Sequence, residues 1–277
     1  MTGLERRQAG AVTVPGIFRR AWLQTLIVGL ALWNILTWSA VASDNLNLVP
    51  SIILVGAFLG PVTFVVYVYE RVRDVPWVAL AQTFVIGGAL GVTAASLLEY
   101  RTVLEYRALP TVAIGLIEET SKLVVPLLFF AAGRFRREAD GLLIGVASGM
   151  GFAALESMGY GLTALLASGG RLDAVTQTLF VRTLLAPAGH AAWTGLVCAA
   201  LWRTRTRRGA WPWVGVAFIV AVALHAWWDS VASSKGSLLP IAAISFGLVL
   251  WRLYASTSPA RAVRRGGLPE RRLARPV

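Results

Sequence analysis

Three ionisable side chains lie in the middle of an apolar stretch, residues 111–131, that is long enough to cross a lipid bilayer. They are Glu118, Glu119 and Lys122. A charged side chain at the centre of a membrane helix costs about 2.5–3.5 kcal/mol on insertion scales, so charges at that depth usually have a function. Adjacent carboxylates beside a cation can move protons, activate water or bind a metal ion.

Further polar residues fall in three later apolar stretches of similar length. Both histidines of the chain, His190 and His225, lie in such stretches, as do Glu156 and Asp229. At about 1.5 Å of rise per residue, the glutamates and histidines all lie between the outer third and the middle of the bilayer. One shared site is therefore geometrically possible, with Asp229 closer to the end of its stretch.

Helical spacing predicts which of these side chains meet. Lys122 follows Glu118 by four residues and Glu119 by three, so its ammonium group can reach either carboxylate. Asp229 follows His225 by four residues, a spacing that suits a carboxylate orienting the imidazole. Glu118 and Glu119 point about 100° apart on a helix, so we expect them to have different roles.

The charges within these stretches do not balance. Four carboxylates are present against two cations, Lys122 and Arg182, and we expect Arg182 to reach toward the outer surface. Protonated carboxylates or a bound divalent cation such as zinc would cancel the remaining negative charge. His190, His225 and Glu156 form a ligand set of the catalytic zinc kind, which leaves a fourth position for water.

The elements that must position these residues are membrane helices. Hydrophobic residues make up 56% of the 277-residue chain and charged residues 14%, and the mean hydropathy is +0.65. We predict an all-α polytopic membrane bundle of about eight transmembrane helices, the first of them uncleaved. The predicted spans are 21–39, 49–69, 76–98, 111–131, 141–166, 177–202, 212–232 and 238–254. Residues 99–107 are expected to form a charged outside loop.

Glycines indicate where these helices can approach one another closely. Gly87, Gly88 and Gly91 lie in the third predicted span. Gly141, Gly145 and Gly149 recur at four-residue spacing in the fifth span and form a small-residue packing face.

The net charge of +12 fits a membrane protein better than a nucleic-acid-binding protein. Only four of the 26 Lys and Arg residues fall in predicted outside loops: Arg101, Arg107, Arg171 and Lys235. This positive-inside pattern predicts cytoplasmic termini and a multi-pass protein of the cell membrane. We predict a basic segment at 1–20, a transmembrane domain at 21–254 and a basic tail at 255–277 suited to anionic inner-leaflet lipids.

Four short motifs follow one another along the chain. They are Glu118-Glu-Thr-Ser-Lys122, Gly151-Phe-Ala-Ala-Leu-Glu156 with Tyr160, His190 followed by Thr194-Gly195, and His225-Ala-Trp-Trp-Asp229. The series resembles that of the PrsW-type intramembrane proteases, relatives of the CAAX-processing and bacteriocin-immunity glutamyl membrane proteases. The resemblance covers a protease-like core at about 110–232.

The resemblance implies a membrane-embedded endopeptidase, of the metalloprotease or metal-free glutamate type, that cleaves a membrane-anchored protein such as an anti-sigma factor. By this likeness the family's functional positions are occupied by Glu118, Glu119, His190 and His225, and Glu156 is the motif glutamate of the intervening helix. We expect Glu118 or Glu119 to deprotonate a water placed by the two histidines, with Lys122 and Asp229 in support.

Two other classes of function fit the same residues. Intramembrane glutamates and histidines also form the proton relays of proton- or cation-coupled transporters. We find no inverted repeat in the sequence and expect no paired broken helices, which transporter folds often have. A catalytically inactive scaffold that binds a partner helix is the remaining alternative.

Overall fold

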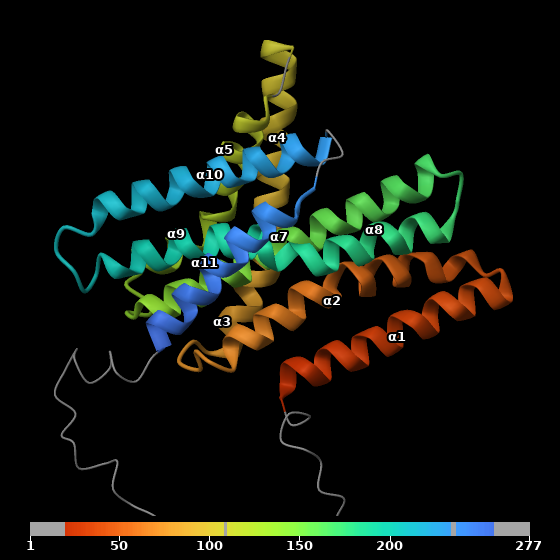
Figure 1. Ribbon diagram of the computed structural model, residues 1–277, viewed down its shortest axis with the longest axis horizontal. Coiled ribbons are helices and arrows are strands. Elements are labelled where there is room, and N and C mark those ends of the chain that lie inside the picture. The colour runs from red at the N-terminus through yellow and green to blue at the C-terminus, as the bar shows by residue number, and fades with distance from the viewer. Residues whose placement is uncertain (1–19, 108–109, 234–236, 258–277) are drawn as a thin grey trace, which may run out of the picture.

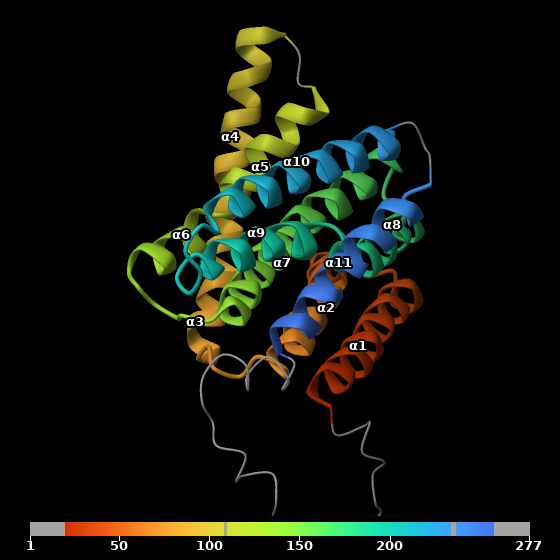
Figure 2. The ribbon, with the colours of Figure 1, turned by 60° about the vertical axis from the view of Figure 1, so that its left-hand side comes forward.

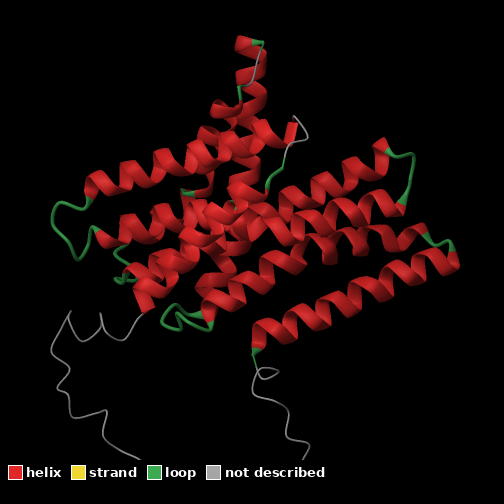
Figure 3. Cartoon of the chain, viewed as in Figure 1, coloured by secondary structure: helices red, strands yellow, loops and turns green. Residues whose placement is uncertain are grey.

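The computed structural model describes residues 20–107, 110–233 and 237–257, and the regular secondary structure within them is helical (Figure 3). The elements are α1 (Ala21–Ser43), η2 (Leu46–Leu48), α2 (Val49–Tyr69), α3 (Trp77–Gln82), η3 (Thr83–Gly87), α4 (Gly88–Tyr106), α5 (Thr111–Lys122), α6 (Val124–Ala131), α7 (Glu138–Ala167), α8 (Leu172–Leu185), η4 (Ala186–Ala188), α9 (His190–Arg203), α10 (Trp211–Ser233) and α11 (Leu239–Thr257). Seven helical segments among these residues are long and apolar enough to cross a membrane. The predicted polytopic helical bundle is confirmed. The predicted basic ends lie almost entirely outside the described residues.

The basic connections gather at one end of the bundle. In Figure 1 the α2–α3 connection, the α9–α10 connection and the end of α11 lie on the left and the start of α1 lies at the bottom, whereas the α1–α2 and α7–α8 connections lie on the right. The α2–α3 connection, the α9–α10 connection and the last residue of α9 together carry six arginines: Arg71, Arg73, Arg203, Arg205, Arg207 and Arg208. This arrangement agrees with the positive-inside prediction.

The prediction of unbroken spans is wrong at residues 111–131. The chain forms α5 and α6 there, separated at Leu123. Pro126 explains the break, because it has no N–H to donate to the carbonyl of Lys122 four residues earlier. The hydroxyl of Ser148 on α7 donates to that carbonyl instead, at 2.6 Å.

The span predicted at 177–202 is broken as well, so the expectation of no paired broken helices is also wrong. Helix α8 gives way to the 3₁₀ turn η4, which contains Pro187, and α9 then begins at His190 after Gly189. Non-helical backbone at membrane depth is tolerated where protein surrounds it, and Ala186 and Ala188 in this turn are buried. His190 therefore stands at the start of a helix, inside the bundle.

Helix α7 runs through the centre of the molecule (Figure 2). Its predicted small-residue face is confirmed, because Gly141, Gly145 and Gly149 all meet α9. A Cβ atom on Gly145 would lie 2.6 Å from the carbonyl oxygen of Thr194, and one on Gly149 would collide with the carbonyl of His190. These glycines let α9 approach α7 closely enough to bring His190 beside the α7 glutamate.

The prediction of a loop at 99–107 is wrong. Helix α4 continues to Tyr106, and Figures 1 and 2 show its far end rising out of the bundle. At its other end α4 crosses α7 in backbone contact, since a Cβ on Gly88 would lie 2.5 Å from the carbonyl carbon of Gly151. This crossing fixes α4 beside α5 and α7, the helices that carry the glutamates.

Candidate active site

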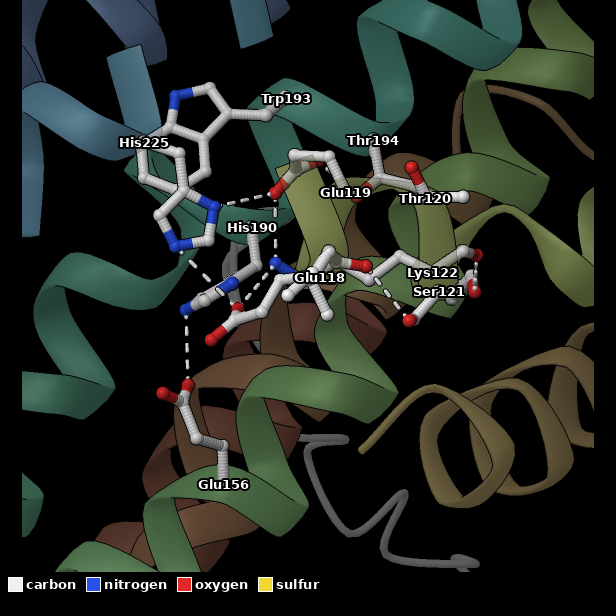
Figure 4. Close-up of polar contacts among 12 residues, drawn as sticks. Glu118, Glu119, Thr120, Ser121, Lys122, Glu156, His190, Trp193, Thr194 and His225 are labelled. Carbon is white, nitrogen blue, oxygen red and sulfur yellow. Dashed lines mark hydrogen bonds and ion pairs between the residues drawn. The ribbon is translucent and has the colours of Figure 1, made fainter. Parts of the chain in front are cut away.

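Side chains from α5, α7, α9 and α10 converge in the middle of the bundle, as the spacing and depth of the residues predicted (Figure 4). The imidazole rings of His190 and His225 lie 5.6 Å apart between their centroids and are nearly perpendicular. Two groups of charged residues meet at these rings. We call Glu118, Glu119, Lys122 and His225 the buried set, and Glu156, Arg182 and His190 the rim set.

The buried set centres on Lys122. Its side chain is 0% exposed, and its ammonium nitrogen lies 3.0 Å from Oε2 of Glu118 and 2.8 Å from Oε1 of Glu119. The ammonium also lies 4.3 Å from the centroid of the Phe152 ring, a cation–π contact. The predicted i+3 and i+4 ion pairs are therefore both present, and Lys122 compensates the glutamate charge inside the bundle.

The two glutamates differ in how their oxygens are engaged. Glu119 is 1% exposed, and its Oε1 contacts Lys122 and Nδ1 of His225 at 2.9 Å, while the hydroxyl of Thr194 donates to Oε2 at 3.3 Å. Glu118 uses only Oε2, which contacts Lys122 and lies 3.5 Å from Nε2 of His225. Its Oε1 has no hydrogen bond to any described residue. Of these two glutamates, only Glu118 has a carboxylate oxygen without a hydrogen bond to a described residue.

The rim set joins three helices at the edge of the site. Oε2 of Glu156 lies 2.6 Å from a guanidinium nitrogen of Arg182 and 3.2 Å from Nε2 of His190. Arg182 also donates through Nε to the hydroxyl of Ser157 at 2.8 Å and lies 4.0 Å over the ring of Tyr160. The expectation that Arg182 only reaches the outer surface is wrong, because its guanidinium group turns back to α7.

Glu119, rather than Asp229, makes the hydrogen bond to His225. Oδ2 of Asp229 lies 3.6 Å from Nε2 of His225, within ion-pair range but too far for a hydrogen bond. Nδ1 of the same ring is within 2.9 Å of Glu119. The predicted pairing on α10 therefore contributes charge near the imidazole, and the carboxylate from α5 fixes the orientation of the ring.

Two residues that sequence reasoning did not identify, Trp193 and Ser245, hold the imidazole ring of His225 in place. The indole ring of Trp193 stacks on the imidazole with 4.6 Å between centroids, and its N–H donates to the hydroxyl of Ser245 at 3.0 Å. Trp193 lies three residues after His190, so the same face of α9 presents both side chains. That spacing was the available signal, whereas the partner on α11 could not be predicted from spacing alone.

Two cavities open onto the site. The first has a volume of about 190 Å³, lies between α8, α9 and α10, and is lined by both histidines, Arg182 and apolar residues such as Leu185. The second has a volume of about 520 Å³, lies between α4, α5, α7 and α10, and is lined by Glu118 and by Glu99 of α4. Glu156, Tyr160 and Asp229 border both cavities. We call them the histidine-side cavity and the α4–α5 cavity.

The donor chemistry of the site suits a divalent metal. Two imidazoles and a carboxylate are a set that zinc accepts, and Nδ1 of His190 is buried without a hydrogen bond to any described residue. Within the described residues, however, no three His, Cys, Asp or Glu side chains stand in a metal-binding arrangement. The set of His190, His225 and Glu156 stays a prediction.

Comparison with known proteins identifies a family for this chain. Searches of curated proteins and of solved structures gave no match. A family model, described as PrsW family intramembrane metalloprotease, matches residues 75–255, which include α3 to α10, most of α11 and every residue of both sets. The match covers well over half of the chain. The chain therefore belongs to the PrsW family of intramembrane metalloproteases and is a membrane-embedded peptidase.

Proposed function

We propose that this peptidase cleaves a membrane-anchored protein within the outer half of the cell membrane, with Glu118 as the general base. The observation that carries the assignment is the contrast between the two motif glutamates. Glu119 has both oxygens engaged and is 1% exposed, whereas Glu118 has one oxygen free at the α4–α5 cavity. A general base must lie within hydrogen-bond reach of the water that it deprotonates.

In the proposed reaction, Glu118 takes a proton from water while the water oxygen attacks the scissile carbonyl carbon. His225, held by Glu119 and Trp193, donates a hydrogen bond to the developing oxyanion. The carbon–nitrogen bond then breaks, and Glu118 passes its proton to the leaving amine. His190, held by Glu156, forms the opposite wall and orients the peptide.

The family description implies a metal, and we expect His190, His225 and Glu156 to hold it. When bound, a divalent ion such as zinc would supply a Lewis acid for the water and the carbonyl group, in place of the hydrogen bond from Nε2 of His225. The substrate class that we propose is a protein with a single membrane span, such as an anti-sigma-factor-like regulator. The basic loops at the inner end of the bundle suit anionic lipids of the inner leaflet.

The test is cleavage of single-span reporter proteins by detergent-purified enzyme. We expect Glu118→Gln to lower kcat by about 10²–10⁴-fold, the range of general-base contributions. Glu105→Gln is the matched control, because it makes the same chemical change on the exposed end of α4. Cleavage by Glu118→Gln at the parental rate would show that Glu118 is not the base.

A further inference from the structure

Glu99 lies outside the family motifs, yet it faces the site. It is on α4, in the segment that sequence reasoning assigned to a loop, and it lines the α4–α5 cavity with Glu118 and Asp229. Oε1 of Glu99 and Oδ2 of Asp229 are buried without a hydrogen bond to any described residue. Buried oxygens of this kind almost always have a partner, and water is the usual one where space allows.

The two cavities share Glu156, Tyr160 and Asp229 but divide the other charged residues of the site. Glu118, Glu99, Ser96 and Thr111 line only the α4–α5 cavity. His190, His225 and Arg182 line only the histidine-side cavity, together with apolar residues of α8 and α10. Glu118, which would deprotonate water, and the two histidines, which would contact a peptide, therefore line different cavities, which meet at the three shared residues.

This division matches what hydrolysis inside a bilayer requires. Each turnover consumes one water molecule, and the hydrocarbon that surrounds the bundle supplies none. The α4–α5 cavity, at about 520 Å³, has room for several waters at roughly 30 Å³ each. Its polar lining continues along α4 through Ser96 and Glu99 toward the end of the helix that rises out of the bundle (Figure 2).

We propose that the α4–α5 cavity is the water inlet of the peptidase, and that Glu99 is the positioning residue that holds water beside Glu118. The peptide enters on the other side, through the histidine-side cavity. The role of Glu99 is to accept a hydrogen bond from a water molecule that then moves to Glu118. This inference rests on the proposed function in one respect, because it takes Glu118 as the base.

The first experiment measures water access without a substrate. Ser96→Cys and Leu97→Cys are compared for labelling by a charged, membrane-impermeant thiol reagent. The two positions are neighbours on α4 and both are exposed, but only Ser96 lines the cavity. The native Cys198 is fully buried, so we expect the reagent not to label it.

We expect Ser96→Cys to be labelled at least about ten times faster than Leu97→Cys, because a thiol facing lipid does not ionise readily. Labelling of Ser96→Cys should also stop cleavage by that variant. Equal labelling rates at the two positions would contradict the proposal that the α4–α5 cavity is the water inlet.

The second experiment tests Glu99 with two substitutions. Glu99→Gln keeps a hydrogen-bond acceptor and should retain most of the activity, whereas Glu99→Leu should lower kcat about tenfold with KM unchanged. Labelling of Ser96→Cys should slow in the Glu99→Leu background, a result that a purely structural role would not produce.

Equal kcat values for the two variants would remove Glu99 from the mechanism, and a change confined to KM would place it on the peptide side instead. Failure of the general-base assignment is distinguishable. If Glu118→Gln cleaves normally, the proposed function fails, while the labelling contrast still reports whether water enters between α4 and α5.

Discussion

The buried set and the rim set contain the same kinds of side chain: carboxylates, a basic residue and a histidine. Their assembly differs. In the buried set, Lys122 and both glutamates come from one helix at i+3 and i+4 spacing. The rim set joins α7, α8 and α9, and two of its members, Glu156 and Arg182, are 26 residues apart in the sequence.

Exposure differs in the same direction. Lys122 and Glu119 are 0% and 1% exposed, whereas Arg182 and Glu156 are 23% and 21% exposed and border a cavity. The buried set must therefore compensate its own charges before any substrate binds, since water does not reach Lys122. A charged group of the rim set can exchange its partner for water or peptide, because solvent reduces the free-energy cost of leaving that charge unpaired. In the proposed mechanism, the buried set is therefore a prebuilt centre and the rim set an adjustable wall.

The largest effect should follow removal of the buried cation. Lys122→Met leaves Glu118 and Glu119 without their shared counter-ion, and breaking a buried pair in this way costs about 3–5 kcal/mol. Thermal unfolding in detergent measures the loss. Arg101→Met, on the exposed end of α4, is the matched control and should change little. A loss no larger than that of the control would mean that water reaches Lys122 and Glu119 as well as Glu118.

Removing the charge of Glu119 should have the next largest effect. Glu119→Gln weakens the contact that orients His225, and loss of such a supporting carboxylate typically lowers activity by about 10–100-fold. Asp229→Asn serves as the comparison, because its oxygen lies 3.6 Å from the same ring and makes no hydrogen bond to it. We expect a much smaller change in kcat for Asp229→Asn. The reverse order would assign the orientation of His225 to Asp229.

The smallest effect should come from the rim set. Arg182→Lys keeps the positive charge but cannot bond to both Ser157 and Glu156, since an ammonium group lacks the fork of a guanidinium group. We expect less than about a tenfold fall in kcat and less destabilisation than in Lys122→Met, measured in the same assays. A larger fall than that of Glu119→Gln would show that the rim set is also prebuilt.

Local spacing predicted the parts of the site that depend on one helix. The contacts of Lys122 follow from the i+3 and i+4 positions of the glutamates, and the glycine face of α7 follows from its four-residue period. The convergence of four helices followed from depth, because polar residues at similar depth in a bilayer have few other partners.

The parts that depend on helix orientation could not be predicted. Arg182 meets Glu156 only because α7 and α8 pack as a hairpin, and Glu99 faces the site only because α4 crosses α7 at Gly88. Spacing within one helix carries no information on either crossing. The break at Leu123 is different, because Pro126 in the sequence indicates it: proline has no N–H to donate to the carbonyl of Lys122.

The pairing of one lysine with two glutamates has an electrostatic consequence. The ammonium group of Lys122 lies within 3.0 Å of a carboxylate oxygen of both Glu118 and Glu119, so it has two counter-ions inside the bundle. When Glu118 takes up a proton in the proposed reaction, Glu119 continues to neutralise the ammonium group. The second glutamate of the motif therefore lets the proposed base change its charge without isolating a cation in the bilayer.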